Sequence, residues 1–383
     1  MKKMLIKTCL SFILVVIIAF DISAQCDGDF VIDGDVDGED VAVFARLLSL
    51  VDPEDPETID AADLADFAAD FGSTTCPLPP PAPLNLFNIG NSIGEGIAAY
   101  EDIGVAHHET VWSTGYDPVD SVYSLNERFE FIDTAGYDEN NDGRELDGIF
   151  NHAIEGDEME DFATQAGAVV ATAGEETPPL TVGMVTVFLG NNDVCTDAVG
   201  TMTDLETFES QYRDGLEALK NSNVTKNAYI HVSGIPAIYW LWIAKRDRFW
   251  CQIVWSEVPC KELLENPGVN DCVTDIYDPD TIDYDPGEGD GPNCIRRKEF
   301  HAAIRDDYNR IIRDVLMEYK ITGRLPNAYY IDIFDIQFEA FHINGGDFLV
   351  GDCFHPSVEG HEVLAREEWC RSPWSIGDPS CAP

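Results

Sequence analysis

The chain has 383 residues, and its 71 acidic side chains against 23 basic ones give a formal net charge of −48. So acidic a surface repels nucleic acid and anionic membranes, and it excludes nucleic acid as a partner. The length is sufficient for a small module beside one large α/β domain.

The first 25 residues have the composition of a secretory signal peptide. Three lysines among the first seven residues precede an apolar run over about 9–20, and small residues follow at Ser23 and Ala24. The run is short for a helix that crosses a bilayer, and no later run is long and apolar enough. We therefore expect a secreted protein. The alternative is a lipid anchor on Cys26, which Gln25 before it disfavours.

The cysteines also favour an exported protein. Of the 11 cysteines, Cys9 lies in the signal peptide, and the ten that remain include no C-x-x-C pair. An even number of cysteines in an exported chain indicates disulfide bonds rather than metal ligation. The pairing is not deducible from the sequence, although Cys26 and Cys76 bracket the first segment of the mature chain.

Residues 26–75 contain an internal repeat, VDGEDVAVFARLLS and IDAADLADFAADFG. Each copy has the pattern of a calcium loop that runs into an amphipathic helix, so a small all-α module is predicted. In the first copy, Asp29, Asp33 and Asp40 fall at loop positions one, five and twelve. Carboxylate oxygens at this spacing suit a hard cation such as Ca²⁺.

The pair of repeats resembles dockerin-type modules. Val31 and Pro56 depart from the pattern at usual ligand positions, and the second loop retains Asp52, Glu54 and Asp63 as candidate ligands. The resemblance implies a structural Ca²⁺ and a cohesin-like protein partner. The alternative is a two-helix acidic module that binds no metal.

A proline-rich stretch at 76–84, CPLPPPAPL, predicts a stiff linker before a domain over 85–383. Apolar runs in that domain predict buried strands at 84–90, 148–154, 180–190, 228–236 and 328–334. Helical patterns follow at 157–172, 206–222 and 297–320. The alternation predicts an α/β fold with three α/β/α layers around a mostly parallel five-stranded sheet.

Functional side chains of such folds gather where the parallel strands end. Ser92 follows the first strand at a strand-to-helix turn, where free backbone N–H groups can bind an oxyanion. Gly156 follows the second strand, and Asn192 follows the third in LGNND. A glycine lets its backbone N–H approach a ligand closely, and an asparagine amide can donate to developing negative charge. Each feature alone equally fits an ordinary turn.

Near the C-terminus, GDCFHPSVEGH places Asp352 three residues before His355. The imidazole can take a proton from a hydroxyl, and the carboxylate can fix its tautomer and stabilise the imidazolium. Pro356 suits the start of the helix that follows. The pair therefore has the chemistry of the base half of an acyl-transfer site.

In chain order, the four strand-end motifs resemble those of the SGNH, or GDSL-like, hydrolase superfamily over most of residues 84–370. FNIGNSIGEG resembles the first block, with Asn91 where aspartate is usual, NHAIEGDEMEDF the second, LGNND the third and DCFHPSVEGH the last. Within the superfamily, the third and last blocks are most similar to those of phospholipase-B-like lipases. The resemblance implies the α/β fold predicted above and a carboxylic ester hydrolase.

The resemblance also implies a role for each motif residue. Ser92 is expected as the nucleophile, His355 as the base and Asp352 as the residue that orients it. The N–H groups of Ser92 and Gly156 and the side chain of Asn192 are expected to form an oxyanion hole. Acyl transfer of this kind requires an ester substrate and no cofactor.

The segment at about 240–296 interrupts the alternation and is rich in aromatic residues. These side chains are either core or an apolar wall or lid for an acyl chain. The segment contains four cysteines, which predict an insertion fastened by disulfides. Cys353 is expected to anchor the loop that carries Asp352 and His355, with a partner that the sequence does not identify.

A further calcium candidate lies in the large domain, in DENNDGRELD. Asp138, Asn140 and Asp142 match positions one, three and five of an EF-type loop. A polar surface turn explains the same residues equally well.

Three classes of function remain open. A lipolytic esterase, either a lipase or a phospholipase, is favoured by the aromatic insertion. A carbohydrate esterase that removes acetyl groups from polysaccharide is favoured by the dockerin-like module. A calcium-dependent binding or scaffold protein with a degenerate hydrolase domain is disfavoured by the intact set of Ser, Gly, Asn and Asp-x-x-His motifs.

Overall fold

In the computed structural model, the chain divides into two units, Met1–Pro79 and Pro80–Pro383. The structure describes residues 82–83, 85–100, 102–116, 121–129, 145–146, 149–175, 179–273, 286–345, 351–375 and 378–381, with single residues at 41, 45 and 71. The segment expected to be a signal peptide and the cysteines at 26 and 76 lie outside the described residues. So do all candidate calcium ligands, which are Asp29, Asp33, Asp40, Asp52, Glu54, Asp63, Asp138, Asn140 and Asp142.

The larger unit is built on one sheet with the strand order β2-β3-β1-β4-β5-β6. Its strands are β1 (Leu86–Gly90), β2 (Glu145–Leu146), β3 (Ile149–Asn151), β4 (Met184–Phe188), β5 (Tyr229–Ser233) and β6 (Ala328–Ile331). All neighbours pair in parallel except β2, which pairs antiparallel with β3. The five parallel strands confirm the predicted sheet. The sequence did not reveal β2, because two residues carry no periodic signal.

The central strands read as continuous apolar runs because both faces of the sheet are covered. All residues of β1 and β4 are buried. The polar side chains among them are paired: the Thr186 hydroxyl donates to Oδ1 of Asn88 (2.7 Å), and Nδ2–H of Asn88 donates to Oδ1 of Asn151 (3.0 Å). These bonds link β4, β1 and β3, so the strands that lead to the first three motifs hold a fixed relative position.

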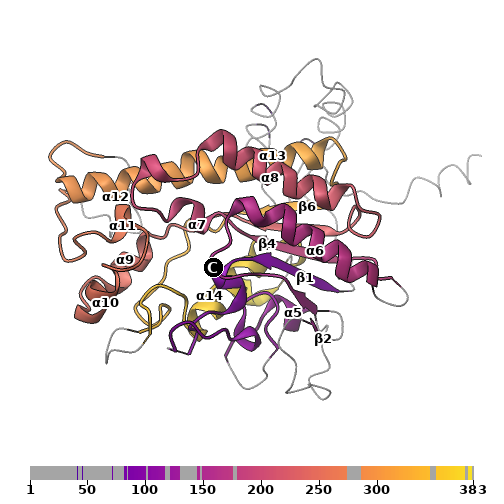
Figure 1. The fold of residues 1–383 in the computed structure, drawn as a ribbon, viewed down its shortest axis with the longest axis horizontal. Helices are drawn as coiled ribbons and strands as arrows, with labels where there is room; N and C mark the ends of the chain where they lie inside the picture. The colour runs from indigo at the N-terminus through magenta and orange to yellow at the C-terminus, as the bar shows by residue number, and fades with distance from the viewer. Residues whose placement is uncertain are drawn as a thin grey trace, which may run out of the picture. The chain divides into compact units, whose positions relative to one another are not determined.

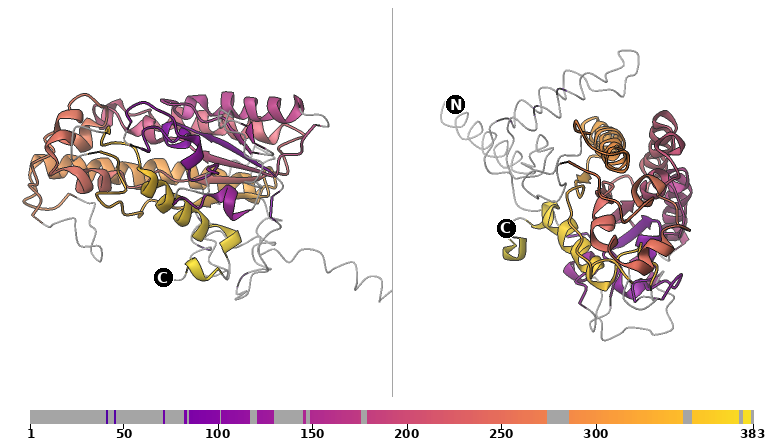
Figure 2. Two further views of the ribbon diagram at one scale, coloured as in Figure 1. Left: turned by 90° about the horizontal axis from the view of Figure 1, so that it is seen from below. Right: turned by 90° about the vertical axis from the view of Figure 1, so that its left-hand side faces the viewer.

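Helices cover both faces of this sheet, as Figures 1 and 2 show. One layer contains α6 (Phe162–Glu175), α8 (Leu205–Lys220) and α13 (Asn309–Ile321), and the other contains α5 (Leu125–Arg128) and α14 (Val358–Cys370). The helices α6 and α8 form where the helical patterns predicted them. The arrangement confirms the three-layer α/β/α architecture.

The helix predicted over 297–320 starts earlier and is less regular than expected. It begins as α12 (Pro292–Ala303), widens into a π-helical turn (Ile304–Tyr308) and continues as α13. Asn309 follows the turn and clamps the loop after β5. Its Nδ2–H donates to the carbonyl of Ile235 (2.8 Å), and its Oδ1 accepts from the N–H of Ile235 (2.7 Å). The spacing of apolar residues does not reveal a π-helical turn of this kind, so the sequence predicted a regular helix.

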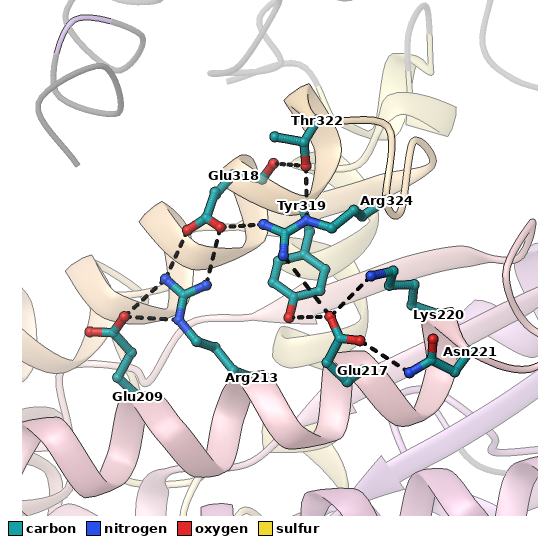
Figure 3. A network of polar contacts seen from close by, with 9 residues as sticks. All are labelled: Glu209, Arg213, Glu217, Lys220, Asn221, Glu318, Tyr319, Thr322 and Arg324. Atoms are coloured by element: carbon teal, nitrogen blue, oxygen red, sulfur yellow. Dashed lines mark hydrogen bonds and ion pairs between the residues drawn. The ribbon is translucent and has the colours of Figure 1, made fainter. Parts of the chain in front are cut away.

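A polar network joins α8 to α13 (Figure 3). Arg213 donates to both carboxylate oxygens of Glu318 (3.2 and 2.8 Å), and the hydroxyl of Tyr319 donates to Glu217 (2.8 Å). Arg324 also binds Glu318. A bidentate pair shared within a network holds its geometry better than an isolated surface ion pair. The network therefore fixes two helices of one layer against each other.

Candidate active site

Ser92 lies at the turn where β1 meets the short helix α4 (Ser92–Glu95). Asn91 caps this helix, because its Oδ1 accepts a hydrogen bond from the N–H of Ile93 (3.1 Å). Aspartate could accept the same bond, so the asparagine at this position keeps the turn. The turn is tight: a Cβ on Gly94 would lie 2.7 Å from the Cβ of Ala153. Ser92 is 6 % exposed, and it begins the helix.

The side chains of Ser92, His355 and Asp352 form one hydrogen-bonded chain. Nε2 of His355 lies 2.8 Å from Oγ of Ser92, and Nδ1 of His355 lies 2.6 Å from Oδ2 of Asp352. With Nδ1–H donating to the carboxylate, Nε2 is left to accept the serine proton. Burial raises the pKa of Asp352, but the hydrogen bonds and charge of His355 and the N–H of Phe354 outweigh it, so this pKa lies below its ordinary value.

The loop that carries Asp352 and His355 is held by Asn344. Oδ1 of Asn344 accepts hydrogen bonds from the backbone N–H groups of Asp352 (2.8 Å) and Cys353 (3.1 Å). The backbone N–H of Asn344 donates to the carbonyl of His355 (3.1 Å). Gly351 packs against this clamp with φ at +73°, and a Cβ there would lie 2.6 Å from backbone atoms of Gly345. The backbone geometry of the loop that carries Asp352 and His355 therefore depends on contacts with the segment that contains Asn344 and Gly345.

Asn192 reaches the same site from the strand beside β1. Gly190 ends the connection from β4 with φ at +101°, and Asn192 follows on α7 (Asn191–Val194). Nδ2–H of Asn192 donates to the carbonyl of Asp157 (2.9 Å). Gly156 directly precedes Asp157 in the chain, and it is exposed, with φ at +84°. The structure thus links Asn192 to the Gly156 segment, although Gly156 itself does not line the cavity described below.

Two supporting side chains escaped the sequence reasoning. Gln165 on α6 is buried, and it exchanges hydrogen bonds with both backbone groups of Gly90 (2.9 and 2.8 Å) and donates to Oδ2 of Asp157 (2.7 Å). Asp193 accepts from the N–H of Met159 (2.8 Å), and burial raises its pKa. Both tie the segment after β3 to the ends of β1 and β4. Only Asp193 had a sequence signal, its place in LGNND.

A cavity opens beside Ser92 and His355. Its polar lining includes Asn91, Asn191 and Asn192. Its apolar lining includes Phe188, Ile238, Leu241, Phe338, Phe354 and Leu364. The hydrogen-bonded chain therefore faces a largely apolar space.

The insertion contributes aliphatic rather than aromatic side chains to this cavity. It contains α9 (Tyr239–Lys245), α10 (Phe249–Val254) and α11 (Lys261–Leu264). Most of its large rings are buried, namely Tyr239, Trp240, Trp242 and Trp255, whereas Phe249 is 76 % exposed. None of these rings lines the cavity, which the insertion borders through Ile238 and Leu241. Of the two interpretations left open, the core is thus the correct one for most of these rings.

Disulfides fasten the insertion to the rest of the domain, as the cysteine count predicted. Cys353 pairs with Cys251 on α10. The other described bonds join Cys195 to Cys260, Cys272 to Cys294, and Cys370 to Cys381. The partner of Cys353 lies 102 residues away in sequence, which is why no local pattern identified it.

The part of the chain that the structure describes contains no group of three or more His, Cys, Asp or Glu side chains that could hold a metal ion. Within the same residues, no helix combines the length and the apolar composition that a bilayer span requires.

Comparisons with known proteins give one family. A model described as GDSL-like lipase/acylhydrolase matches residues 86–368. No curated protein matches the chain. Among solved structures, the chain is similar to the psychrotrophic esterase EstA from Pseudoalteromonas sp., with 13 % identity and a TM-score of 0.34, over 76 % of this chain and 96 % of that chain. The family match spans well over half of the sequence, and the chain therefore belongs to the GDSL-like lipase/acylhydrolase family of carboxylic ester hydrolases.

Proposed function

We propose that this ester hydrolase works by acyl transfer through Ser92, His355 and Asp352. The observation that carries the proposal is the hydrogen-bonded chain of these side chains beside the cavity. Ser92 Oγ attacks the ester carbonyl while Nε2 of His355 takes its proton, and the imidazolium returns this proton to the departing alcohol. Water then attacks the acyl-enzyme, the acid leaves, and Ser92 regains its proton.

The oxyanion of each tetrahedral intermediate is bound, in this proposal, by the N–H groups of Ser92 and Gly156 and by the amide of Asn192. The amide has two N–H groups, and the bond to the carbonyl of Asp157 orients it while leaving one free to donate. Loss of a single donor of this kind raises the barrier by about 3–4 kcal/mol.

The substrate we propose is an ester with an apolar acyl chain, as a lipase or phospholipase takes. The support is the lining of the cavity, where Phe188, Leu241 and Phe354 lie near Ser92. A long acyl chain buries apolar surface against such walls, whereas an acetyl group buries little. An acetyl esterase acting on polysaccharide is the other outcome that a substrate panel can give.

The test combines one substitution with such a panel. Ser92→Ala should abolish hydrolysis of p-nitrophenyl esters while the thermal unfolding midpoint stays near that of the wild type. The matched control is Ser113→Ala, a buried serine outside the site, which should keep full turnover. Wild-type turnover in Ser92→Ala would overturn the mechanism. Faster turnover of acetate esters and acetylated xylan than of octanoate esters and phospholipid would overturn the substrate class.

We also propose that the protein is exported, with a calcium-binding dockerin-like module over 26–75 and a proline-rich linker before the hydrolase domain. Four disulfides among the described residues support an oxidising compartment. Calorimetric titration of the full chain with Ca²⁺ tests the module. Binding that the double variant Asp29→Asn/Asp33→Asn loses would support it, and equal heats in both proteins would refute it.

A further inference from the structure

Helix α10 of the insertion is fastened to the loop that carries the base. Cys251 forms a disulfide with Cys353, which lies between Asp352 and His355. Nε1–H of Trp255 donates to the carbonyl of Cys353 (2.8 Å). Since the N–H of Cys353 is bound by Asn344, its N–H, carbonyl and sulfur atom all have a partner. The loop is held through this one residue.

Cys353 has a backbone conformation that needs such support. Its φ is +55°, in the left-handed region that residues other than glycine seldom adopt. A residue remains in this region only where its surroundings determine its position by several contacts. Cys251 and Cys353 are fully buried and Trp255 is 1 % exposed, so these contacts are shielded from water.

The same segment is fastened at its other end to the helix that carries Asn192. Cys260 forms a disulfide with Cys195, the residue that caps the end of α7. The N–H of Cys260 donates to the carbonyl of Cys195 (3.1 Å), and Cys260 is also left-handed, with φ at +72°. Cys195 lines the cavity. Each end of the segment thus meets an element of the candidate site.

We propose that residues 251–260 are a brace that sets the base loop and α7 at their working separation, with Cys251, Trp255 and Cys260 as positioning residues. The inference rests on the proposed function. Because Asp352 and His355 flank Cys353, a shift of that residue displaces the imidazole relative to Ser92. A displacement of about 1 Å can lower a rate by about a hundredfold. The brace therefore acts on turnover more than on substrate binding.

Trp255→Phe is the first test, because it deletes one hydrogen bond and leaves both disulfides in place. We expect kcat for a p-nitrophenyl ester to fall about tenfold while KM stays within about twofold. Trp242→Phe is the matched control. This tryptophan is equally buried in the same insertion, but its Nε1–H donates to the carbonyl of Pro267 (2.8 Å). A wild-type kcat in Trp255→Phe, or an equal loss in Trp242→Phe, would overturn the brace.

Paired cysteine removal is the second test. Replacing both cysteines by alanine in the bond of Cys251 with Cys353, or in that of Cys195 with Cys260, should lower kcat at least tenfold. The controls remove the bond between Cys272 and Cys294, in the same insertion, or that between Cys370 and Cys381 at the end of α14. These controls should lower the unfolding midpoint and keep kcat.

The outcomes separate the brace from the proposed function. An inactive Ser92→Ala together with wild-type kcat in the site-linked cysteine pairs would refute the brace alone. An active Ser92→Ala would refute the proposed function itself. Should a site-linked cysteine pair not fold, Trp255→Phe against Trp242→Phe decides the question, since neither changes a covalent bond.

Discussion

Two of the hydrogen-bonded pairs of a histidine and a carboxylate among the described residues invite comparison, His355 with Asp352 and His231 with Glu368, and of these two only the first faces a serine. His355 and Asp352 lie on one loop with a separation of 2.6 Å between Nδ1 and Oδ2. His231 on β5 and Glu368 on α14 are 137 residues apart, with 2.8 Å between Nε2 and Oε2. The chemistry of the two pairs is alike, and their surroundings are not.

Access distinguishes the pairs. The side chains of His355 and Asp352 are each 12 % exposed, and the second ring nitrogen of His355 meets Ser92. Both side chains of the other pair are fully buried. Nδ1 of His231 has no hydrogen-bond partner among the described residues. An imidazole beside a carboxylate becomes a candidate base only where a nucleophile and a cavity lie next to it.

The largest expected effect separates the pairs by activity. Asp352→Asn should lower kcat about 10,000-fold, because an amide that donates to Nδ1 forces the tautomer whose Nε2 can no longer accept the serine proton. Steady-state kinetics on a p-nitrophenyl ester measure the change. A loss below about tenfold would mean that the carboxylate does not set the tautomer.

The matched substitution in the buried pair, Glu368→Gln, should leave kcat within about twofold of the wild type. It should instead lower the free energy of unfolding by about 1–3 kcal/mol, because it disturbs a fully buried hydrogen bond. Chemical denaturation gives the stability, and the same ester assay gives kcat. If Glu368→Gln lowered kcat as strongly as Asp352→Asn, the distinction by access would fail.

A buried histidine without a carboxylate sharpens the comparison through pH. Burial, and then the charges of His355 and His107, lower the pKa of His361 to about 3, and neither of its ring nitrogens has a partner among the described residues. In the unfolded chain the pKa of this histidine is about 6.5. Between about pH 3 and pH 6.5 the unfolded chain therefore binds a proton at His361 that the folded chain does not bind. The contribution of neutral His361 to the free energy of unfolding is therefore fully present above pH 6.5. It decreases as the pH drops, and about 2 kcal/mol of it is lost at pH 5.

His361→Gln removes this titration. The drop in unfolding free energy between pH 8 and pH 5 should be about 2 kcal/mol smaller in the variant than in the wild type. Denaturant unfolding at the two pH values measures both drops. Equal drops in the two proteins would show that His361 is not held neutral in the fold.

The smallest expected effect concerns the clamp on the base loop. Asn344→Ala leaves the N–H groups of Asp352 and Cys353 without their acceptor, and kcat should fall about tenfold at unchanged KM. Asn85→Ala is the control. That side chain bridges Thr181 and Gly183 before the start of β4, and its loss should lower stability alone. A similar fall of kcat in both variants would assign Asn344 a merely structural role.

Much of the fold was predictable because its signals are local. Strands buried on both faces read as apolar runs, and the amphipathic pattern of α8 gives its length to within two residues. The positions of Ser92 and Asn192 at strand ends followed from those runs. The expected helix over 297–320 missed its π-helical turn, because apolar spacing does not report a side-chain clamp such as that of Asn309.

By itself, the sequence determined which residues follow the strands and which two groups share the last loop, since both depend on neighbours along the chain. Only the tertiary structure decided how that loop is held. Asn344, Trp255 and Cys251 approach Cys353 from segments 9, 98 and 102 residues away. Such contacts depend on the packing of whole elements, and packing leaves no periodic pattern in the segments that it brings together.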